Sequence, residues 1–361
     1  MTDPLPPIEE VPAAHLTGRV LPNGWMVQEL VAKSAGATGG LFSVAYRVAD
    51  HEGREAFLKA LNFHAALTTP GGSIIDRLQE FTTAYRFERD LLKDCTVRRM
   101  SRVIRLLDDG EIEVPEAGVI SRVPYLILEL ADGDLRAFQQ RLGRFDVAWF
   151  FRTMKHATVG VEQLHAAQTA HQDLKPSNVL TQNDGSEMKL GDLGRAERRN
   201  VDGPASTNPI PGAVAYAPPE QLYGAFGGHW EERCASDMYL LGSLAVQLVL
   251  GHTLSALLQG ALSETFRFGK WAGDYATVLP YVTLAHANVM GAFEERLRLL
   301  IDLPDLEDEL SEAVRQMTDP DPRRRGHPRD RVAQTSSHAV RRYVSLFNRL
   351  AARAEFRFLR A

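Results

Sequence analysis

The chain has 361 residues, of which 44% are hydrophobic and 24% charged, and its formal net charge is −5. This length suits two lobes or one large domain, and the near balance of 41 basic and 46 acidic residues predicts neither a nucleic-acid nor a membrane-surface partner. With only two cysteines, Cys95 and Cys234, a disulfide framework is excluded and a reducing compartment is favoured.

The N-terminal sequence, MTDPLPPIEEV, has acids and prolines where a signal peptide needs basic and then apolar residues. The most apolar stretch, residues 238–250, is thirteen residues long, short of the roughly 18 that a membrane-spanning helix needs. These features predict a cytoplasmic protein without a membrane segment. Residues 1–20 are proline-rich and weakly patterned, so they are expected to form a loose extension.

Strand-like segments follow the extension. WMVQELV, SVAYRVA and EAFLKAL, all within residues 25–61, carry alternating or β-rich apolar positions and are separated by glycines. Residues 77–95 then show the three-to-four-residue spacing of an amphipathic helix. Strand-like segments return at residues 102–107 and 123–130.

The later part of the chain has mostly helical patterning. Apolar residues recur every three or four positions over residues 150–164, residues 238–250 are apolar nearly all round, and the helical pattern returns in the tail. A strand-rich part followed by a helix-rich part predicts an α+β protein with two lobes. The predicted lobes cover residues 21–129 and 130–330, and a helical extension covers residues 331–361.

Two neighbouring segments hold the residue types that phosphoryl transfer needs: HQDLKPSNVL at 171–180 and KLGDLGRA at 189–196. The reaction requires a carboxylate that orients or deprotonates a hydroxyl, oxygen ligands for magnesium, and a cation near the moving phosphoryl group. Asp173 supplies the carboxylate in this interpretation, and Lys175 supplies the cation. The metal ligands are Asn178 and Asp192.

These segments resemble the catalytic loop, H-R-D-L-x-x-x-N, and the D-F-G motif of eukaryotic-type serine/threonine protein kinases. The resemblance covers residues 25–330. It implies a bilobal kinase-like fold with a small β-rich N-terminal lobe and a larger helical C-terminal lobe, and it gives His171 a structural role. The implied activity is transfer of the γ-phosphoryl group of ATP to serine or threonine hydroxyls of a protein substrate, with Mg²⁺ or alternatively Mn²⁺.

By the same resemblance, Lys59 in EAFLKAL is the lysine that holds the α- and β-phosphates of ATP. Its expected partner is a glutamate on the following helix. Glu88 lies inside the apolar stripe of that helix, where an unpaired charge is costly, whereas Glu80 lies off the stripe and should face water. Glu88 is therefore the predicted partner.

The sequence GATGGLFSVAY, residues 36–46, resembles the glycine loop of the family, but its last glycine is replaced. Gly36, Gly39 and Gly40 are the residues expected to bring backbone amides close to phosphate. A plain hairpin turn is the alternative for each of these glycines.

LILELADGDL, residues 126–135, resembles the hinge that binds adenine in the family. The resemblance places the Leu128 side chain in front of the adenine pocket and assigns the backbone from Glu129 to Ala131 to the adenine edge. Asp134 either reaches the ribose or caps the following helix, and the sequence favours neither alternative.

The C-terminal lobe carries two further matches. GAVAYAPPEQL, residues 212–222, resembles the end of the activation segment, in which Glu220 pairs with an arginine near the end of the domain; Arg323 is the first choice among three adjacent arginines. In SDMYLLG, Asp237 resembles the aspartate that braces the backbone of the catalytic loop. Both are scaffold roles.

The chain departs from the family pattern at two informative positions. Gln172 replaces the arginine that docks a phosphate on the activation segment, so activity that depends on phosphorylation there is disfavoured, although Ser206 and Thr207 are available in the segment. Ala213 replaces a threonine whose hydroxyl contacts the catalytic loop.

These departures motivate an alternative, a nucleotide-binding pseudokinase that acts as a scaffold or regulator. A small-molecule phosphotransferase of the aminoglycoside or choline type is a further and weaker alternative, because Lys175 and the A-P-P-E segment favour a protein kinase. The C-terminal extension is expected to cover the helical lobe; the alternative is a helix that docks a regulatory partner.

Overall fold

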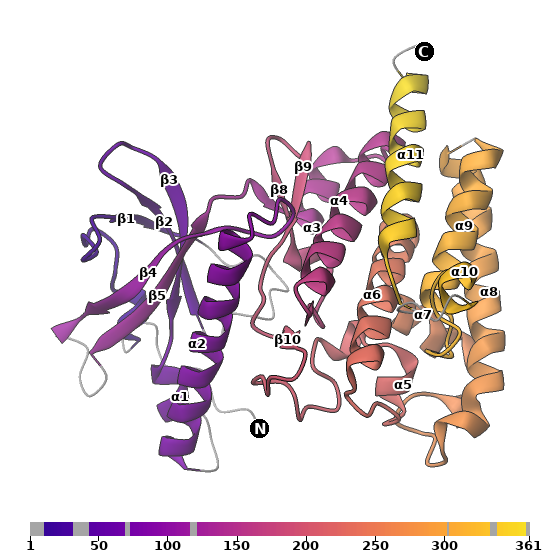
Figure 1. Cartoon of the computed structure of the whole chain (residues 1–361), viewed down its shortest axis with the longest axis horizontal. Helices are drawn as coiled ribbons and strands as arrows, with labels where there is room; N and C mark the ends of the chain where they lie inside the picture. The colour runs from indigo at the N-terminus through magenta and orange to yellow at the C-terminus, as the bar shows by residue number, and fades with distance from the viewer. Residues whose placement is uncertain are drawn as a thin grey trace. The chain divides into compact units, whose positions relative to one another are not determined.

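The computed structural model describes residues 11–31, 43–68, 73–115, 121–301, 303–332 and 338–358. The chain divides into two compact units, drawn in Figure 1. The small unit comprises residues 1–100 and 104–131, and the large unit comprises residues 101–103 and 132–361. The small unit is built on a β-sheet and the large unit is mostly helical, so the predicted α+β fold is confirmed.

The small unit is built on an antiparallel sheet of five strands in the order β1-β2-β3-β5-β4. The strands are β1 (Met26–Leu30), β2 (Ser43–Ala49), β3 (Glu55–Leu61), β4 (Leu106–Glu113) and β5 (Arg122–Glu129). Side chains of β3 alternate between buried and partly exposed positions, as a half-buried strand requires. Ala56, Leu58 and Ala60 enter the core, which leaves Lys59 on the opposite face.

One long helix packs against this sheet. After the short helix α1 (His64–Thr68), Ser73 caps α2 (Ile74–Val97) by accepting a hydrogen bond from the backbone N–H of Asp76. The predicted apolar stripe is buried from Tyr85 to Cys95, and this buried part includes Glu88. The Tyr85 hydroxyl donates to the carbonyl oxygen of Tyr125 on β5 at 3.3 Å, which fixes α2 to the sheet.

The segment before β1 differs from the expectation of a loose extension. Within residues 11–20 the short 3₁₀ helix η2 (Pro12–Ala14) and Leu16 lie against the sheet, and Leu16 is fully buried. The Tyr46 hydroxyl donates to the carbonyl oxygen of Ala13 at 2.8 Å. The prediction was wrong for residues 11–20 because their apolar residues pack into the core of the small unit. Residues 1–10 lie outside the described residues.

The large unit consists mainly of helices: α3 (Leu135–Leu142), α4 (Val147–Ala166), α5 (Pro219–Leu222), α6 (Trp230–Leu250), α7 (Leu254–Ala261), α8 (Tyr275–Ile301), α9 (Pro304–Thr318), α10 (Pro328–Val332) and α11 (Arg341–Phe358). Short 3₁₀ helices are η4 (Pro176–Asn178), η5 (Val214–Tyr216) and η6 (Glu264–Phe266). Its strands form two small sheets, β6-β8-β9 and β10-β7: β6 (Gly133–Asp134), β7 (Thr169–Ala170), β8 (Val179–Gln182), β9 (Glu187–Leu190) and β10 (Glu197–Arg198).

The helices predicted at 150–164 and 238–250 are the buried helices α4 and α6. Asp146 caps α4 through the backbone N–H of Trp149, and Gly251, with φ of 77°, ends α6 in the left-handed conformation that glycine favours. In the part of the chain that the structure describes, no single helix is long and apolar enough to cross a membrane, although α6 and α7, bent by 78°, satisfy length and composition as a pair.

The C-terminal helix α11 lies beside α4 (Figure 1). Its stripe of Tyr343, Phe347, Leu350 and Ala354 is almost fully buried. The helix therefore covers apolar surface of the large unit, which is the alternative that the sequence analysis favoured for this tail.

Candidate active site

In the large unit, the Asp173 carboxylate is held through both of its oxygens. Oδ2 accepts hydrogen bonds from Lys175 Nζ at 2.7 Å and from Asn178 Nδ2 at 3.1 Å, and Oδ1 accepts from the backbone N–H of Ala213 at 2.8 Å. Asp173 and Lys175 are only 6% and 8% exposed. The carboxylate is therefore fixed in one orientation by three donors.

Asp237, fully buried on α6, holds the loop that carries Asp173. Its two carboxylate oxygens accept the backbone N–H groups of His171 at 2.7 Å and Gln172 at 2.8 Å. Gln172 has φ of 63°, a left-handed conformation that costs free energy and persists only where its surroundings hold it. The predicted brace between Asp237 and the catalytic loop is present.

His171 joins the loop to the segment that contains Asp192. Its Nδ1 accepts the backbone N–H of Asp173 at 3.3 Å, so in the neutral ring Nε2 carries the hydrogen and donates to the carbonyl oxygen of Gly191 at 3.2 Å. The fully buried imidazole thus ties the residue before Asp192 to the catalytic loop.

Sequence reasoning missed His165, which contacts the brace from α4. Its Nε2 lies 2.8 Å from Asp237 Oδ2. Burial raises the pKa of Asp237, but His165, His171 and the Gln172 N–H together outweigh burial and lower that pKa below its ordinary value. Burial likewise lowers the pKa of His165, but hydrogen bonds to Asp237 and Cys234 raise it to about 10. The pair is a buried ion pair behind the loop.

This ion pair predicts a loss of stability in mild alkali. The pKa of His165 is about 10 in the folded chain and 6.5 when unperturbed, so its contribution is complete below pH 6.5 and declines as the pH rises towards 10. We expect the free energy of unfolding to fall by about 2 kcal/mol between pH 6.5 and about 8.5. Urea unfolding measures it, and His165→Gln should flatten the dependence; an unchanged slope in this variant contradicts the assignment.

Asn178 and Asp192 present the oxygen atoms that a magnesium ion prefers. Asn178 Nδ2 donates to the Asp173 carbonyl at 2.7 Å, so the amide group is oriented. Its Oδ1, which accepts a hydrogen bond from the Ser177 hydroxyl at 3.3 Å, is the side-chain atom that a metal would bind. The Gly191 N–H donates to the Asn178 carbonyl at 2.8 Å, which brings the chain just before Asp192 beside Asn178. Asp192 itself is exposed.

This donor set fits Mg²⁺ held together with phosphates. Protein sites of this kind supply one or two oxygen ligands and leave the remaining positions to substrate phosphates and water. Among the described residues no group of three or more His, Cys, Asp or Glu side chains could hold a metal by itself. An amide oxygen and one carboxylate are therefore the type of partial site that a nucleotide completes.

In the small unit, Lys59 on β3 and Glu88 on α2 form the predicted ion pair. Lys59 Nζ donates to both carboxylate oxygens of Glu88, at 2.7 and 2.9 Å. Glu88 is 7% exposed and Glu80 is exposed, as the position of each relative to the apolar stripe predicts. The pair fixes the position of the Lys59 ammonium group.

The predicted hinge residues Leu128, Glu129 and Ala131 all belong to the small unit. Leu128 is buried at the end of β5, opposite Phe57. The backbone of Glu129 donates to the Arg105 carbonyl at 3.0 Å, and its side chain accepts the Arg105 N–H at 2.8 Å. Ala131 is the last residue of the small unit.

Asp134 caps α3. Its carboxylate accepts the backbone N–H groups of Arg136 and Ala137 at 2.9 and 3.0 Å and pairs with the Arg136 guanidinium at 2.8 Å. The helix-capping alternative therefore describes this residue, and a ribose contact stays a prediction. Gly36, Gly39 and Gly40 lie outside the described residues.

The predicted pairing of Glu220 with Arg323 is wrong. Arg325 forms this pair: its two terminal nitrogens donate to the two Glu220 oxygens at 2.7 and 2.9 Å, and its side chain is fully buried. Arg323 is 83% exposed and pairs with Asp321. The turn that starts at Asp321 decides which of the adjacent arginines points inward.

Gln172 and Ala213, the two departures from the family pattern, both form hydrogen bonds at the catalytic loop. The Gln172 amide donates to Asp237 at 3.0 Å and to the Arg233 carbonyl at 2.9 Å, so it reinforces the brace. Arg233 in turn donates to the Ser206 carbonyl at 3.1 Å. Ala213 lacks a hydroxyl, but its backbone N–H contacts Asp173. Arg233 is a second residue that the sequence analysis missed.

Residues 40–333 match the family model of the protein kinase domain. The chain belongs to the protein kinase family. This match spans most of the chain and includes both sets of predicted site residues, Lys59 with Glu88 and the loop from His171 to Asp192. Membership confirms the kinase-like fold and implies, in general, the use of ATP with a divalent metal ion.

Three curated relatives illustrate the similarity. The serine/threonine-protein kinase PknL of Mycobacterium tuberculosis is 30% identical over 176 residues, 48% of this chain and 40% of the relative. PknA of the same species is 26% identical over 235 residues, which are 65% of this chain and 48% of PknA. Mitogen-activated protein kinase kinase 9 of Arabidopsis thaliana is 28% identical over 170 residues, which are 46% of this chain and 51% of that kinase. The chain thus spans about half the length of these relatives.

Proposed function

We propose that this chain is a serine/threonine protein kinase that transfers the γ-phosphoryl group of ATP to a hydroxyl group of a protein substrate. The observation that carries the proposal is the Asp173 carboxylate, held by Lys175, Asn178 and the Ala213 backbone in a loop that Asp237 braces. Kinase family membership and the serine/threonine kinases among its relatives support it.

In this proposal Asp173 orients the attacking hydroxyl and accepts its proton. Lys175 bonds to Asp173 Oδ2 and places its ammonium group where negative charge moves during transfer. Both side chains are nearly buried, so their attraction for developing charge is weakened little by water. Most of the rate enhancement comes from positioning and from charge stabilisation.

Lys59 holds the α- and β-phosphates of ATP, and Glu88 keeps its ammonium group in place. Asn178 and Asp192 would hold Mg²⁺, with Mn²⁺ as an alternative. When bound, the ion neutralises charge on the phosphates and helps to orient them. Leu128, the backbone from Glu129 to Ala131, and the glycines of the loop are assigned to the nucleotide by resemblance.

The structure favours an active kinase over the alternatives. Gln172 and Ala213, the residues that suggested a pseudokinase, both keep hydrogen bonds at the catalytic loop. Lys175 contacts Asp173, and Glu220 of the A-P-P-E segment is anchored by a buried arginine. These are the two features that disfavour a small-molecule phosphotransferase.

The test is transfer of label from ATP, with Mg²⁺ or Mn²⁺, to the protein itself and to a generic basic substrate protein. We expect label in the wild type and a reduction on the order of 100-fold in Lys59→Met, because one cation that stabilises phosphate charge is lost. Lys93→Met is the matched control, since Lys93 lies on α2 but pairs with Asp109. Absence of label from the wild type with both metals contradicts the proposal.

A further inference from the structure

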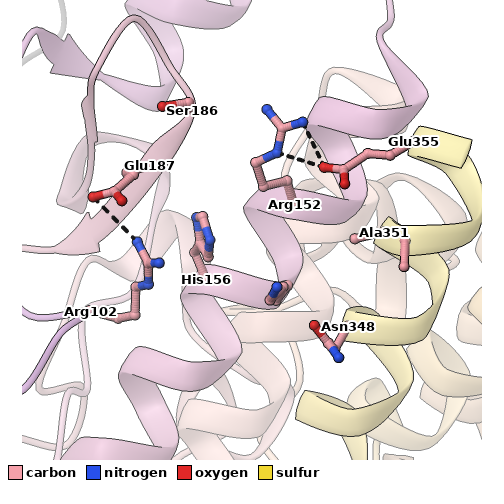
Figure 2. A pocket seen from close by; sticks show the side chains of 10 residues that line it. Arg102, Arg152, His156, Ser186, Glu187, Asn348, Ala351 and Glu355 are labelled. Carbon is pink, nitrogen blue, oxygen red and sulfur yellow. Dashed lines mark hydrogen bonds and ion pairs between the residues drawn. The ribbon is translucent and has the colours of Figure 1, made fainter. Parts of the chain in front are cut away.

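A charged pocket of about 240 Å³ lies in the large unit between α4, the turn of the β8–β9 hairpin and α11. Figure 2 shows its walls, with His156 between Arg102 and Arg152. The lining comprises Arg102, Arg152, Lys155, His156, Ser186, Glu187, Asn348, Ala351, Ala352 and Glu355. None of these residues belongs to the catalytic loop, so the function proposed above leaves this pocket unexplained.

The inner wall of the pocket is positively charged. Three cationic side chains line it against two carboxylates. The guanidinium-bearing side chains of Arg102 and Arg152 are 20% and 30% exposed, whereas Glu187 and Glu355 are 41% and 42% exposed. The two arginine side chains are therefore less exposed than the two acids, and water screens the acids more strongly.

The two carboxylates pair only partly with these cationic side chains. Arg102 lies 3.7 Å from the nearest Glu187 oxygen, which is longer than a hydrogen bond. Arg152 directs two of its nitrogens at a single oxygen of Glu355, at 3.0 and 2.7 Å. Lys155 forms no ion pair with any residue that the structure describes. Donors for an incoming anion are thus available on three side chains.

His156 adds a neutral donor to this wall. Its Nδ1 accepts the backbone N–H of Met188 on β9 at 3.2 Å, so the hydrogen of the neutral ring is on Nε2. Burial first, and then the charges of Arg102, Lys155 and Arg152, lower the pKa of His156 to about 3. At neutral pH the ring is therefore uncharged and its second nitrogen can donate only.

We propose that this pocket binds a small phosphate-bearing anion, either inorganic phosphate or a compact phosphate monoester. Two guanidinium groups, one ammonium group and hydroxyl and amide side chains at the rim match the several acceptor oxygens of a phosphate. A volume of about 240 Å³ is smaller than the roughly 300–1,000 Å³ of pockets for drug-sized ligands. The pocket therefore fits a phosphate with few further atoms rather than a nucleotide.

The position of the pocket connects its ligand to the catalytic segments through one hairpin. Ser186 and Glu187 of the lining stand where β9 begins, and β9 runs directly to Gly191 and Asp192. At the other end of the hairpin, Val179 pairs with Leu190. An anion in the pocket thus contacts the strand that leads to the proposed metal ligand.

The experiment measures binding to the full chain by calorimetry, with inorganic phosphate and O-phosphoserine as probes at low ionic strength. We expect Lys155→Met to weaken binding about tenfold, the loss of one charge-assisted contact. Glu355→Gln should strengthen it several-fold, because the carboxylate that competes for Arg152 is removed. Two variants with opposite effects on affinity separate binding from misfolding, which weakens binding in both.

Arg349→Gln is the control, since Arg349 lies on α11 outside the pocket and pairs with Glu309. It should leave the affinity unchanged. Binding of both probes identifies the phosphate group as the ligand, and binding of phosphoserine alone identifies a monoester. No binding of either probe at millimolar concentration, or equal affinities in Lys155→Met and Glu355→Gln, overturns the proposal. Because the readout is binding, it does not depend on kinase activity.

Discussion

Asp173→Asn is expected to lower the rate of phosphoryl transfer by about 10³-fold, within the range for loss of a general base. The asparagine side chain has the same shape, but it cannot accept the proton of the attacking hydroxyl. The substitution also replaces an acceptor with a donor. In the wild type, Oδ2 of Asp173 accepts hydrogen bonds from both Lys175 and Asn178, so an NH₂ group at that position would face two donors. The first effect removes the base, and the second disturbs the contacts that orient the side chain.

Steady-state kinetics with labelled ATP measure this loss. We expect it in kcat, with little change in the KM for ATP, because the nucleotide contacts are assigned to other residues. Asp305→Asn makes the same chemical change at an exposed site on α9, where Asp305 pairs with Arg353 at the surface, and it should keep full activity. Undiminished turnover in Asp173→Asn removes Asp173 from the proposed mechanism.

The site was predictable from the sequence where its residues are close in the chain or lie on one buried face. Asp173, Lys175 and Asn178 lie within six residues of one another, so their spacing alone brings them together in a single loop. The resemblance implied that Lys59 pairs with a glutamate of the following helix, and Glu88 was chosen over Glu80 because a carboxylate inside an apolar helical stripe needs a partner. Helix capping by Asp134 follows a local rule, and the structure shows it.

The sequence could not identify residues whose roles depend on distant partners. His165 contacts Asp237 across 72 residues, and nothing in its own helix marks it as charged. Arg233 donates to the carbonyl of Ser206, 27 residues earlier in the chain, and no local sequence pattern marks this contact. Residues 11–20 are held by tertiary contacts such as that between Tyr46 and Ala13, which local patterning does not encode. In each case long-range packing decided the outcome.

Arg325→Met is expected to destabilise the protein by about 3–5 kcal/mol, the cost of removing one partner from a buried ion pair. Glu220, with 4% of its side chain exposed, loses both of its guanidinium contacts and keeps a buried carboxylate. The guanidinium also donates to the carbonyl oxygens of Asp319 and Ala235, and each of them loses this hydrogen bond as well. Urea unfolding of the full chain measures the difference.

Arg323→Met is the matched control, because it deletes a neighbouring arginine whose ion pair with Asp321 is at the surface. Its cost should be much smaller than that of Arg325→Met, because an ion pair exposed to water contributes little to stability. The double variant Glu220→Met, Arg325→Met should be less destabilised than Arg325→Met alone, since no uncompensated charge is left in the core. Equal losses in Arg323→Met and Arg325→Met contradict the pairing, because only one of the two side chains can occupy the buried position beside Glu220.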